Sequence, residues 1–251
     1  MHALLPMVAP PPQRSLLLVG PGAHFGTQLA QRFVAEGFAI ALLARSRRHL
    51  DPLSEDIRRV GGVATSAIAD VVNATQVRQA IDTTLTGLPP LSCVIFNVKA
   101  SAPGRALELD PSVLTACLAA NVSGAVAVIQ AAQPWLRDRR RVVILTGGGY
   151  KDKPNSDKLA LSVSKAALHS LFRSSAEPLL AAGISLKTIV IDGAVRETGP
   201  LFPEDVAACF WAMYTHPTRR VFRYPSCGPA NGIKQLGLFR GALTNGVRVG
   251  N

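Results

Sequence analysis

The sequence has few cysteines, and none of them form a close pair. Cys93, Cys117, Cys209 and Cys227 are the four cysteines in 251 residues. Because their spacing is wide and no C-x-x-C pair occurs, neither a disulfide framework nor a metal site is expected. We expect reduced, mostly buried thiols, as is usual for a protein of the cytoplasm.

The sequence also lacks a long uninterrupted apolar run and a secretory signal. The longest apolar stretch, Val113–Leu136, is broken by polar residues such as Asn121 and Gln130. This pattern favours a buried interface helix over a membrane span, so no membrane contact is expected. Residues 1–14 contain four prolines and no basic segment before an apolar one. They are expected to form a flexible N-terminal arm.

Acidic and aromatic residues are both scarce. The chain has 16 acidic and 27 basic residues, a net charge of +11, and only 6% aromatic residues. The arginines form short, dispersed clusters, and no basic stretch carries the series of aromatic residues on which bases stack. Nucleic-acid binding is therefore not expected, and an anionic cofactor with a generally basic surface explains the charge more simply.

Short aliphatic runs alternate with longer helical patterns along most of the chain. This alternation predicts an α/β fold, a Rossmann-like doubly wound parallel sheet in a single domain at residues 15–224. The predicted strands are 15–19, 39–44, 63–69, 92–96, 142–146 and 185–191. The predicted helices are 26–36, 47–60, 74–86, 111–136, 158–182 and 203–214. The glycine-rich tail at 225–251 has little periodicity, and it remains open as a flap over the substrate, an oligomer arm or a disordered segment.

A glycine-rich turn joins the first predicted strand to the first predicted helix. Gly20, Gly22 and Gly26 form it, together with His24 and Phe25. Glycines let a backbone turn sharply and approach a ligand, and a helix N-terminus offers free N–H groups and a positive dipole to a diphosphate. The strand before and the helix after supply the context that such a motif requires, so we predict a dinucleotide site. His24 either contacts the diphosphate or has a structural role.

The residues after the second and third strands favour NADP(H). Arg45 and Ser46 stand where an NAD-preferring site usually has an acidic residue, and arginine accommodates a 2′-phosphate. An exposed arginine at a helix start is the alternative. Asp70 and Val71 follow the third strand, where Asp70 either accepts from the adenine amino group or caps the helix beginning near Asn73.

Several motifs in this order resemble those of the short-chain dehydrogenase/reductases, over residues 15–214. The matching motifs are Ala-Arg-Ser at 44–46, Ala-Asp-Val at 69–71, Asn-Val-Ser-Gly at 121–124 and Ser-Lys-Ala-Ala at 164–167. The resemblance implies a Rossmann sheet, a nicotinamide cofactor, carbonyl or alcohol chemistry on a small molecule, and a homodimer or homotetramer built on the fourth and fifth helices. It also implies cofactor contacts at Asn97 and Val98 after the fourth strand and at Gly193 after the sixth. Lys99, where the family keeps a small residue, either contacts a cofactor phosphate or ribose or points to solvent.

The departures from this family fall on the groups that carry its chemistry. In the family, a tyrosine four residues before the helical lysine transfers the proton, and a serine after the fifth strand orients the substrate. Leu161 stands at the tyrosine position and Gly147 at the serine position. In the first turn, Val19 and His24 replace a threonine and a glycine, and Gly22 is expected to compensate.

Lys165 and Asn121 remain of the family's four catalytic groups. The resemblance implies that Lys165 holds the cofactor ribose; alternatively, it acts through water as a proton donor. Tyr150, just past the fifth strand, is a candidate replacement acid, and an ordinary loop tyrosine is the alternative.

These features favour an NADP(H)-dependent oxidoreductase that moves hydride to or from a small carbonyl, imine or alkene, with non-standard proton delivery. Two alternatives stay open: a redox-neutral cyclase, isomerase or dehydratase, and a non-catalytic NADP(H)-binding regulator.

Overall fold

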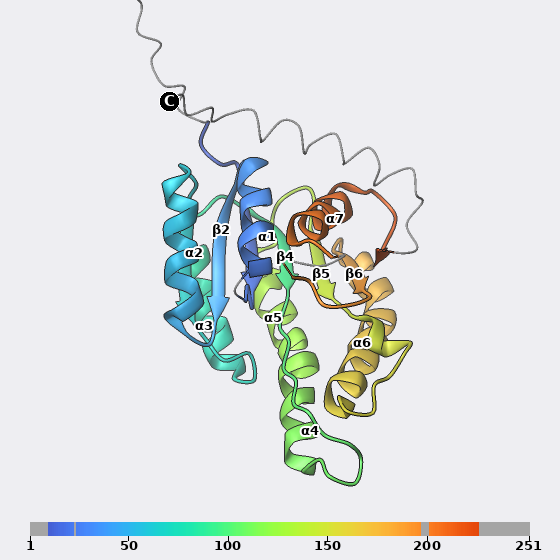
Figure 1. Ribbon diagram of the computed structural model, residues 1–251. Helices are drawn as coiled ribbons and strands as arrows, with labels where there is room; N and C mark the ends of the chain where they lie inside the picture. The colour runs from blue at the N-terminus through green and yellow to red at the C-terminus, as the bar shows by residue number, and fades with distance from the viewer. Residues whose placement is uncertain (1–9, 23, 197–200, 226–251) are drawn as a thin grey trace, which may run out of the picture.

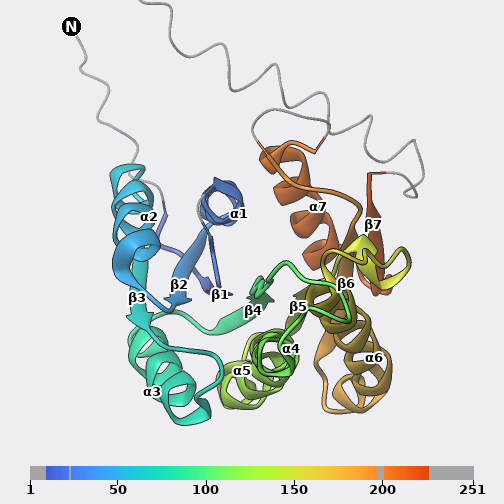
Figure 2. The ribbon, with the colours of Figure 1, turned by 60° about the horizontal axis from the view of Figure 1, so that its bottom comes forward.

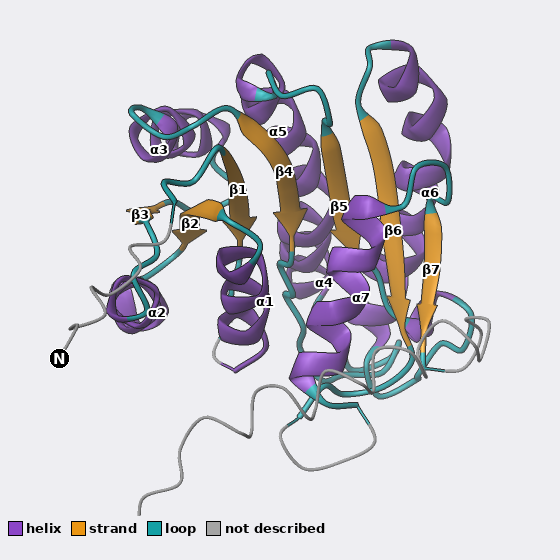
Figure 3. Ribbon diagram, turned by 90° about the horizontal axis from the view of Figure 1, so that it is seen from above, coloured by secondary structure: helices purple, strands orange, loops and turns teal. Residues whose placement is uncertain are grey.

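The computed structural model describes residues 10–22, 24–196 and 201–225, and these form one seven-stranded parallel sheet (Figure 1). The strands are β1 (Arg14–Val19), β2 (Phe38–Ala44), β3 (Ala64–Ile68), β4 (Leu91–Phe96), β5 (Val142–Thr146), β6 (Ser185–Ile191) and β7 (Val221–Tyr224). They lie in the order β3-β2-β1-β4-β5-β6-β7 (Figure 3), and every neighbouring pair is parallel. The predicted Rossmann-like doubly wound sheet is confirmed.

Helices cover both faces of the sheet, so its central strands are buried on both sides (Figure 2). One face carries α1 (His24–Ala35), α2 (Arg47–Arg59) and α7 (Pro203–Thr215). The other carries α3 (Ala74–Leu85), α5 (Gly124–Ala132) and α6 (Leu159–Ala181). Burial on both faces explains why β1, β2 and β4 read as almost continuous apolar runs.

Six of the seven strands match the sequence prediction, and β7 is the one that it missed. Its four residues form an edge strand that pairs only with β6. A segment this short, with one exposed end, carries too little periodic pattern to stand out from a loop. The N-terminal arm predicted for residues 1–14 is one residue too long, because Arg14 already belongs to β1; residues 1–9 and the tail from 226 lie outside the described residues.

The long helix predicted at 111–136 is divided. It consists of α4 (Pro111–Leu118), a π-helical turn (Ala119–Ser123), α5, and a 3-10 turn (Gln133–Trp135). By length and composition alone, the segment Pro111–Trp135 is apolar enough to cross a membrane, contrary to the expectation from its polar residues. Within the fold, the inner face of α5 packs on the sheet.

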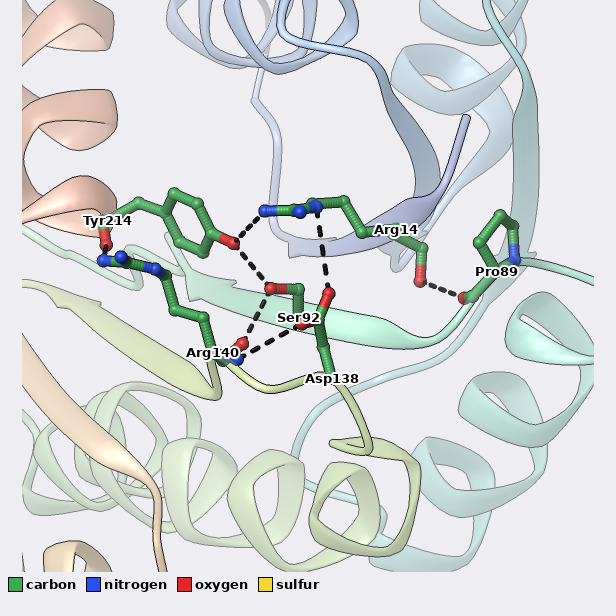
Figure 4. Close-up of polar contacts among 7 residues, drawn as sticks. Arg14, Pro89, Ser92, Asp138, Arg140 and Tyr214 are labelled. Atoms are coloured by element: carbon green, nitrogen blue, oxygen red, sulfur yellow. Dashed lines mark hydrogen bonds and ion pairs between the residues drawn. The ribbon is translucent and has the colours of Figure 1, made fainter. Parts of the chain in front are cut away.

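The amino end of the sheet is closed by a polar network (Figure 4). The Ser92 hydroxyl lies 2.7 Å from the Tyr214 hydroxyl, which also accepts from the Arg14 guanidinium at 3.2 Å. Arg140 donates to the backbone carbonyls of Tyr214 and Thr215, at 3.1 and 2.8 Å. These contacts join the C-terminus of α7 to β1 and β4 and satisfy carbonyl groups that a helix end leaves unpaired.

Lys187, from within the core, satisfies two further carbonyl groups at the C-terminus of α7. Its side chain is in β6 and only 1% exposed, and its Nζ donates to the carbonyls of Met213 and His216, both at 2.5 Å. Burial, together with the charge of Arg140, lowers the pKa of Lys187 to about 8. A cation is favourable at a helix C-terminus, so two carbonyls and the helix dipole offset part of the cost of burying it.

Replacement of this lysine tests whether it stabilises the end of α7. Lys187→Met keeps the apolar stem but leaves two buried or half-buried carbonyls unpaired, so we expect the free energy of unfolding to fall by about 2 kcal/mol. Urea unfolding at pH 7 measures the change, with the exposed Lys153→Met as the matched control. Equal midpoints for Lys187→Met and the wild type would show that the two carbonyls do not depend on this side chain.

Candidate active site

A cleft of about 1140 Å³ opens at the carboxyl ends of the strands. The loops that follow β1 to β6 all contribute to its lining. It lies where the strand order reverses, since β1 is flanked by β2 on one side and by β4 on the other. In open α/β sheets this crevice is where ligands bind.

The glycine-rich turn forms one wall of the cleft. Gly20 and Gly22 both line it, with φ angles of +72° and +69°, a region that favours glycine. A Cβ on Gly20 would also lie 3.0 Å from a methyl of Val98. The Asn97 side-chain amide donates to the Gly20 carbonyl at 2.9 Å, which ties the end of β4 to the turn.

The remaining turn residues have different places. Gly26 does not line the cleft; it is a packing position, because a Cβ there would overlap the backbone of Pro21. Phe25 lines the cleft and packs on Phe210 of α7, with ring centroids 5.6 Å apart. His24 begins α1, and the position of its side chain lies outside the described structure.

Arg45 and Ser46 are exposed at the end of β2 and line the cleft, as predicted. His49, from the first turn of α2, stands beside them and was missed by the sequence analysis. Arg47 instead pairs with Asp51 along the helix at 3.8 Å. This end of the cleft therefore offers an arginine, a hydroxyl and an imidazole to one ligand group.

Asp70 and Val71 also line the cleft, after β3. The alternative that Asp70 caps the next helix is wrong, because Asn73 is the N-cap of α3 and accepts from the Gln76 amide at 3.0 Å. Asp70 accepts from the Val72 amide at 3.2 Å, which holds its carboxylate at the cleft.

Lys165 lies deep in the cleft, on α6. It is 6% exposed, and its Nζ donates to the Thr146 carbonyl at 2.7 Å. Burial and the nearby charge of Lys99 lower the pKa of Lys165 to about 8. Among the described residues it has no carboxylate partner, so the ammonium is held by little more than one carbonyl. Such a group releases or takes up a proton near neutral pH.

The two positions at which the chain lacks the catalytic tyrosine and serine of the short-chain dehydrogenase/reductases line the same cleft as this lysine. Leu161 lines the cleft and is 4% exposed, and it has no proton to transfer. The Gly147 amide donates to the Ile189 carbonyl at 2.8 Å, and a Cβ on Gly147 would lie 2.7 Å from that oxygen. The backbone therefore leaves no room for a serine at this position.

Tyr150 lines the cleft from the short 3-10 turn Gly149–Lys151. Lys158 places its Nζ 5.8 Å from the centre of the Tyr150 ring, within the range of a cation–π contact. The tyrosine is half-buried.

Asn121 does not line the cleft, in contrast to its predicted catalytic role. It is fully buried in the π-helical turn, where its Oδ1 accepts from the Ala100 amide and its Nδ2 donates to the Ala100 carbonyl, both at 2.8 Å. Both amide atoms are thus engaged. Asn121 is a positioning residue that fixes the loop carrying Val98 and Lys99, both of which line the cleft.

Ion pairs connect β7 with the loops that follow β5 and β6. Arg223 of β7 donates to Asp192 at 2.7 Å and also to Asp152. Hydrogen bonds from Lys151 and Arg223 lower the pKa of Asp152. A Cβ on Gly149 would overlap the Asp192 carboxylate, so a glycine at this position leaves room for the ion pairs of Asp192. Asp192 and Gly193 both line the cleft.

Four further cleft residues carry a basic group that the sequence analysis did not assign to the site. They are His49, Lys153, Lys158 and Arg196. All four belong to loops or helix starts at the carboxyl ends of strands, and that position is the signal that points to them.

Comparison with known proteins gives the family. A family model described as short chain dehydrogenase matches residues 14–198. Tropinone reductase-like 3 of Erythroxylum coca is 28% identical over 156 residues, which cover 61% of this chain and 60% of that protein. The chain spans between 40% and 60% of the length of the curated relatives it matches.

Solved structures share the fold. An apo short chain oxidoreductase of Pseudomonas aeruginosa PAO1, described as containing an atypical catalytic center, aligns with a TM-score of 0.77 and 17% identity, over 86% of this chain and 97% of that one. A metagenomic short-chain oxidoreductase in complex with NADP aligns with a TM-score of 0.73 and 20% identity, over 84% and 96%. With the family model covering most of the sheet and the cleft, the chain belongs to the short-chain dehydrogenase/reductase family.

Proposed function

We propose that the protein is an NADP(H)-dependent oxidoreductase that moves hydride to or from a small carbonyl, imine or alkene. Lys165 is the proposed proton donor or acceptor. The observation that carries this proposal is that the glycine turn, Arg45 and the buried Lys165 all line one cleft. Membership of the dehydrogenase family and relatives named as reductases support it.

The residues of the cleft fit NADP(H). Gly22 has no atom within 4 Å of where its Cβ would be, and it and Gly20 turn the backbone where a diphosphate has to approach. Arg45 and His49 supply the charge and the hydrogen-bond donors that a 2′-phosphate requires. Two structural neighbours are named as complexes with NADP or NADPH, which supports the same cofactor.

The protein's own contribution to such a reaction is proton delivery and exclusion of water. NADPH, when bound, supplies a hydride. A carbonyl oxygen that becomes an alcohol needs one proton, and Lys165 is the buried donor in the cleft; with a pKa of about 8 it is mostly protonated at neutral pH. Leu161 has no proton to transfer and Gly147 has no side chain, so neither competes with Lys165 as a proton donor. Tyr150 is the second candidate donor, from the loop after β5.

A redox-neutral enzyme is the second candidate, favoured by the same two positions. Without a tyrosine and a serine, the site lacks the pair with which the family handles a carbonyl, whereas a lysine alone serves proton transfer in an isomerisation or dehydration. Turnover that leaves the NADPH absorbance unchanged would favour this candidate. Cofactor binding with no turnover of any kind would favour the regulator.

Arg45→Ala tests the choice of cofactor. Loss of a charge-assisted contact to the 2′-phosphate is expected to weaken NADPH binding by about 10- to 100-fold and to leave NADH binding nearly unchanged. Titration of the NADPH fluorescence measures both constants, and the neighbouring Arg48→Ala, outside the cleft, is the matched control. An equal loss for NADH and NADPH would contradict the assignment.

The pH dependence tests Lys165. Because burial lowers its pKa to about 8, a carbonyl reduction that takes its proton from Lys165 should slow as the pH rises through 8. Lys165→Met should lower kcat by about 100-fold or more and remove this dependence. Tyr150→Phe should keep it. A Lys165→Met variant with an unchanged kcat and pH profile would sink the proposal, and NADPH titration shows separately whether cofactor binding survives.

Gly147→Ser tests whether the family's serine position is closed. The serine Cβ would lie 2.7 Å from the Ile189 carbonyl, so we expect a lower Tm and no gain of activity, even when combined with Leu161→Tyr. The matched control is Gly148→Ser, since the nearest atom to a Cβ there is 3.8 Å away. A Gly147→Ser variant as stable as the control, with raised activity in the double variant, would contradict the argument.

A further inference from the structure

Three lysine side chains line the part of the cleft that is formed by the loops after β4 and β5. Lys99 follows β4, Lys153 follows β5, and Lys158 directly precedes α6. All three are exposed, and they line the same cavity as the buried Lys165. Two loops, one after β4 and one between β5 and α6, thus bring three lysines to one space.

These cations have almost no acidic partners. Asp70 and Asp192 are the acidic residues among those that line the cleft in the described structure. Asp70 lies at the β3 end, and Asp192 is paired with Arg223 at 2.7 Å. Within the described ranges, no ion pair involves Lys99, Lys153 or Lys158. The wall therefore carries an uncompensated positive charge, which focuses anions into a cleft.

The cofactor's phosphates do not account for all of this charge. The diphosphate belongs at Gly20 and Gly22 after β1, and a 2′-phosphate belongs at Arg45 after β2. The loop with Lys153 and Lys158 follows β5, three strands from β2 in the sheet order, which is about 14 Å at the usual strand spacing. Lys99, after β4, directly follows Val98, which lies against Gly20, so it can serve the cofactor instead. Lys153 and Lys158 remain for another ligand.

The neighbourhood of these two lysines is suited to a small organic anion. Tyr150 precedes both lysines in the same loop, is half-buried, and has its ring centre 5.8 Å from the Lys158 Nζ. A ring, a hydroxyl and two ammonium groups that line one cleft offer an apolar contact and charge-assisted hydrogen bonds to the same molecule.

We propose that the substrate of this cleft carries a carboxylate or a phosphate, and that Lys153 and Lys158 bind that group. The carbonyl part of such a substrate rests on the function proposed above, whereas the recognition of charge does not. Both lysines then act in substrate binding, and Lys165 stays free for the proton.

Probes of equal shape and different charge test the proposal. Calorimetric titration of the protein saturated with NADP⁺, which has no hydride to give to an aldehyde, measures the binding of 4-carboxybenzaldehyde, 4-formylphenyl phosphate and the neutral 4-formylbenzamide. We expect at least one anion to bind 10-fold or more tightly than the amide, and raised salt to reduce the difference. Comparison of the two anions distinguishes a carboxylate from a phosphate.

The variant Lys153→Gln/Lys158→Gln is expected to lose most of this preference with no change in NADP⁺ affinity. Arg78→Gln/Arg139→Gln, which removes two exposed arginines outside the cleft, is the control for net charge. Equal binding of the amide and both anions would overturn the proposal. So would an anion preference that survives in the lysine double variant, or a loss of NADP⁺ affinity there, which would assign these lysines to the cofactor.

Hydride transfer is tested in a separate assay, which measures NADPH consumption. Preferential anion binding without NADPH consumption for any carbonyl would leave the anion site standing and remove the proposed reductase function. NADPH consumption with neutral and charged aldehydes alike would keep the reductase and overturn the anion site.

Discussion

The parallel pairing of β1 with β2 on one side and with β4 on the other is the constraint on which the site depends. Because all seven strands run in the same direction, their carboxyl ends meet at one edge, and the chain leaves β1 in a turn that has to clear β4. Gly20 meets that need with a φ of +72° and no side chain against Val98. The same reversal opens the cleft, so the fold and the ligand site have one cause.

In the proposed reaction, proton transfer depends on one buried ammonium group. Lys165 has a carbonyl of β5 as its partner and no carboxylate among the described residues, so burial favours its neutral form and brings its pKa to about 8. The substitutions around it are consistent with one another. Leu161 keeps the surroundings apolar, and the contact of Gly147 with Ile189 closes the position of the missing serine. Lys165 is therefore a buried ionisable group with a leucine and a glycine at the family's tyrosine and serine positions.

The sequence was sufficient for six of the seven strands and for the glycine turn and Arg45 at the cleft. Strands buried on both faces read as apolar runs, and the glycine turn and Arg45 are local signals at strand ends. The sequence was not sufficient where tertiary contacts decide. Asn121 has the residue type of a site group, yet both its amide atoms bind Ala100 across the fold. The π-helical turn around it has no local signature.

Lys153 and Lys158, in contrast, line the cleft although the sequence analysis did not assign them to the site. Each is an unremarkable loop lysine in the sequence, because a loop gives no period from which to infer the direction of a side chain. Only the assembled sheet brings the loop after β5 to the cleft. The edge strand β7 matters in the same way, since Arg223 joins Asp152 and Asp192 across loops that are far apart in the chain.

The most direct test of this account is a crystal structure of the protein with NADP⁺. The account predicts the 2′-phosphate at Arg45, the diphosphate on the turn at Gly20 and Gly22, and Lys165 as the nearest ionisable side chain to the nicotinamide. A 2′-phosphate bound away from Arg45, or a nicotinamide that points away from Lys165, would contradict it.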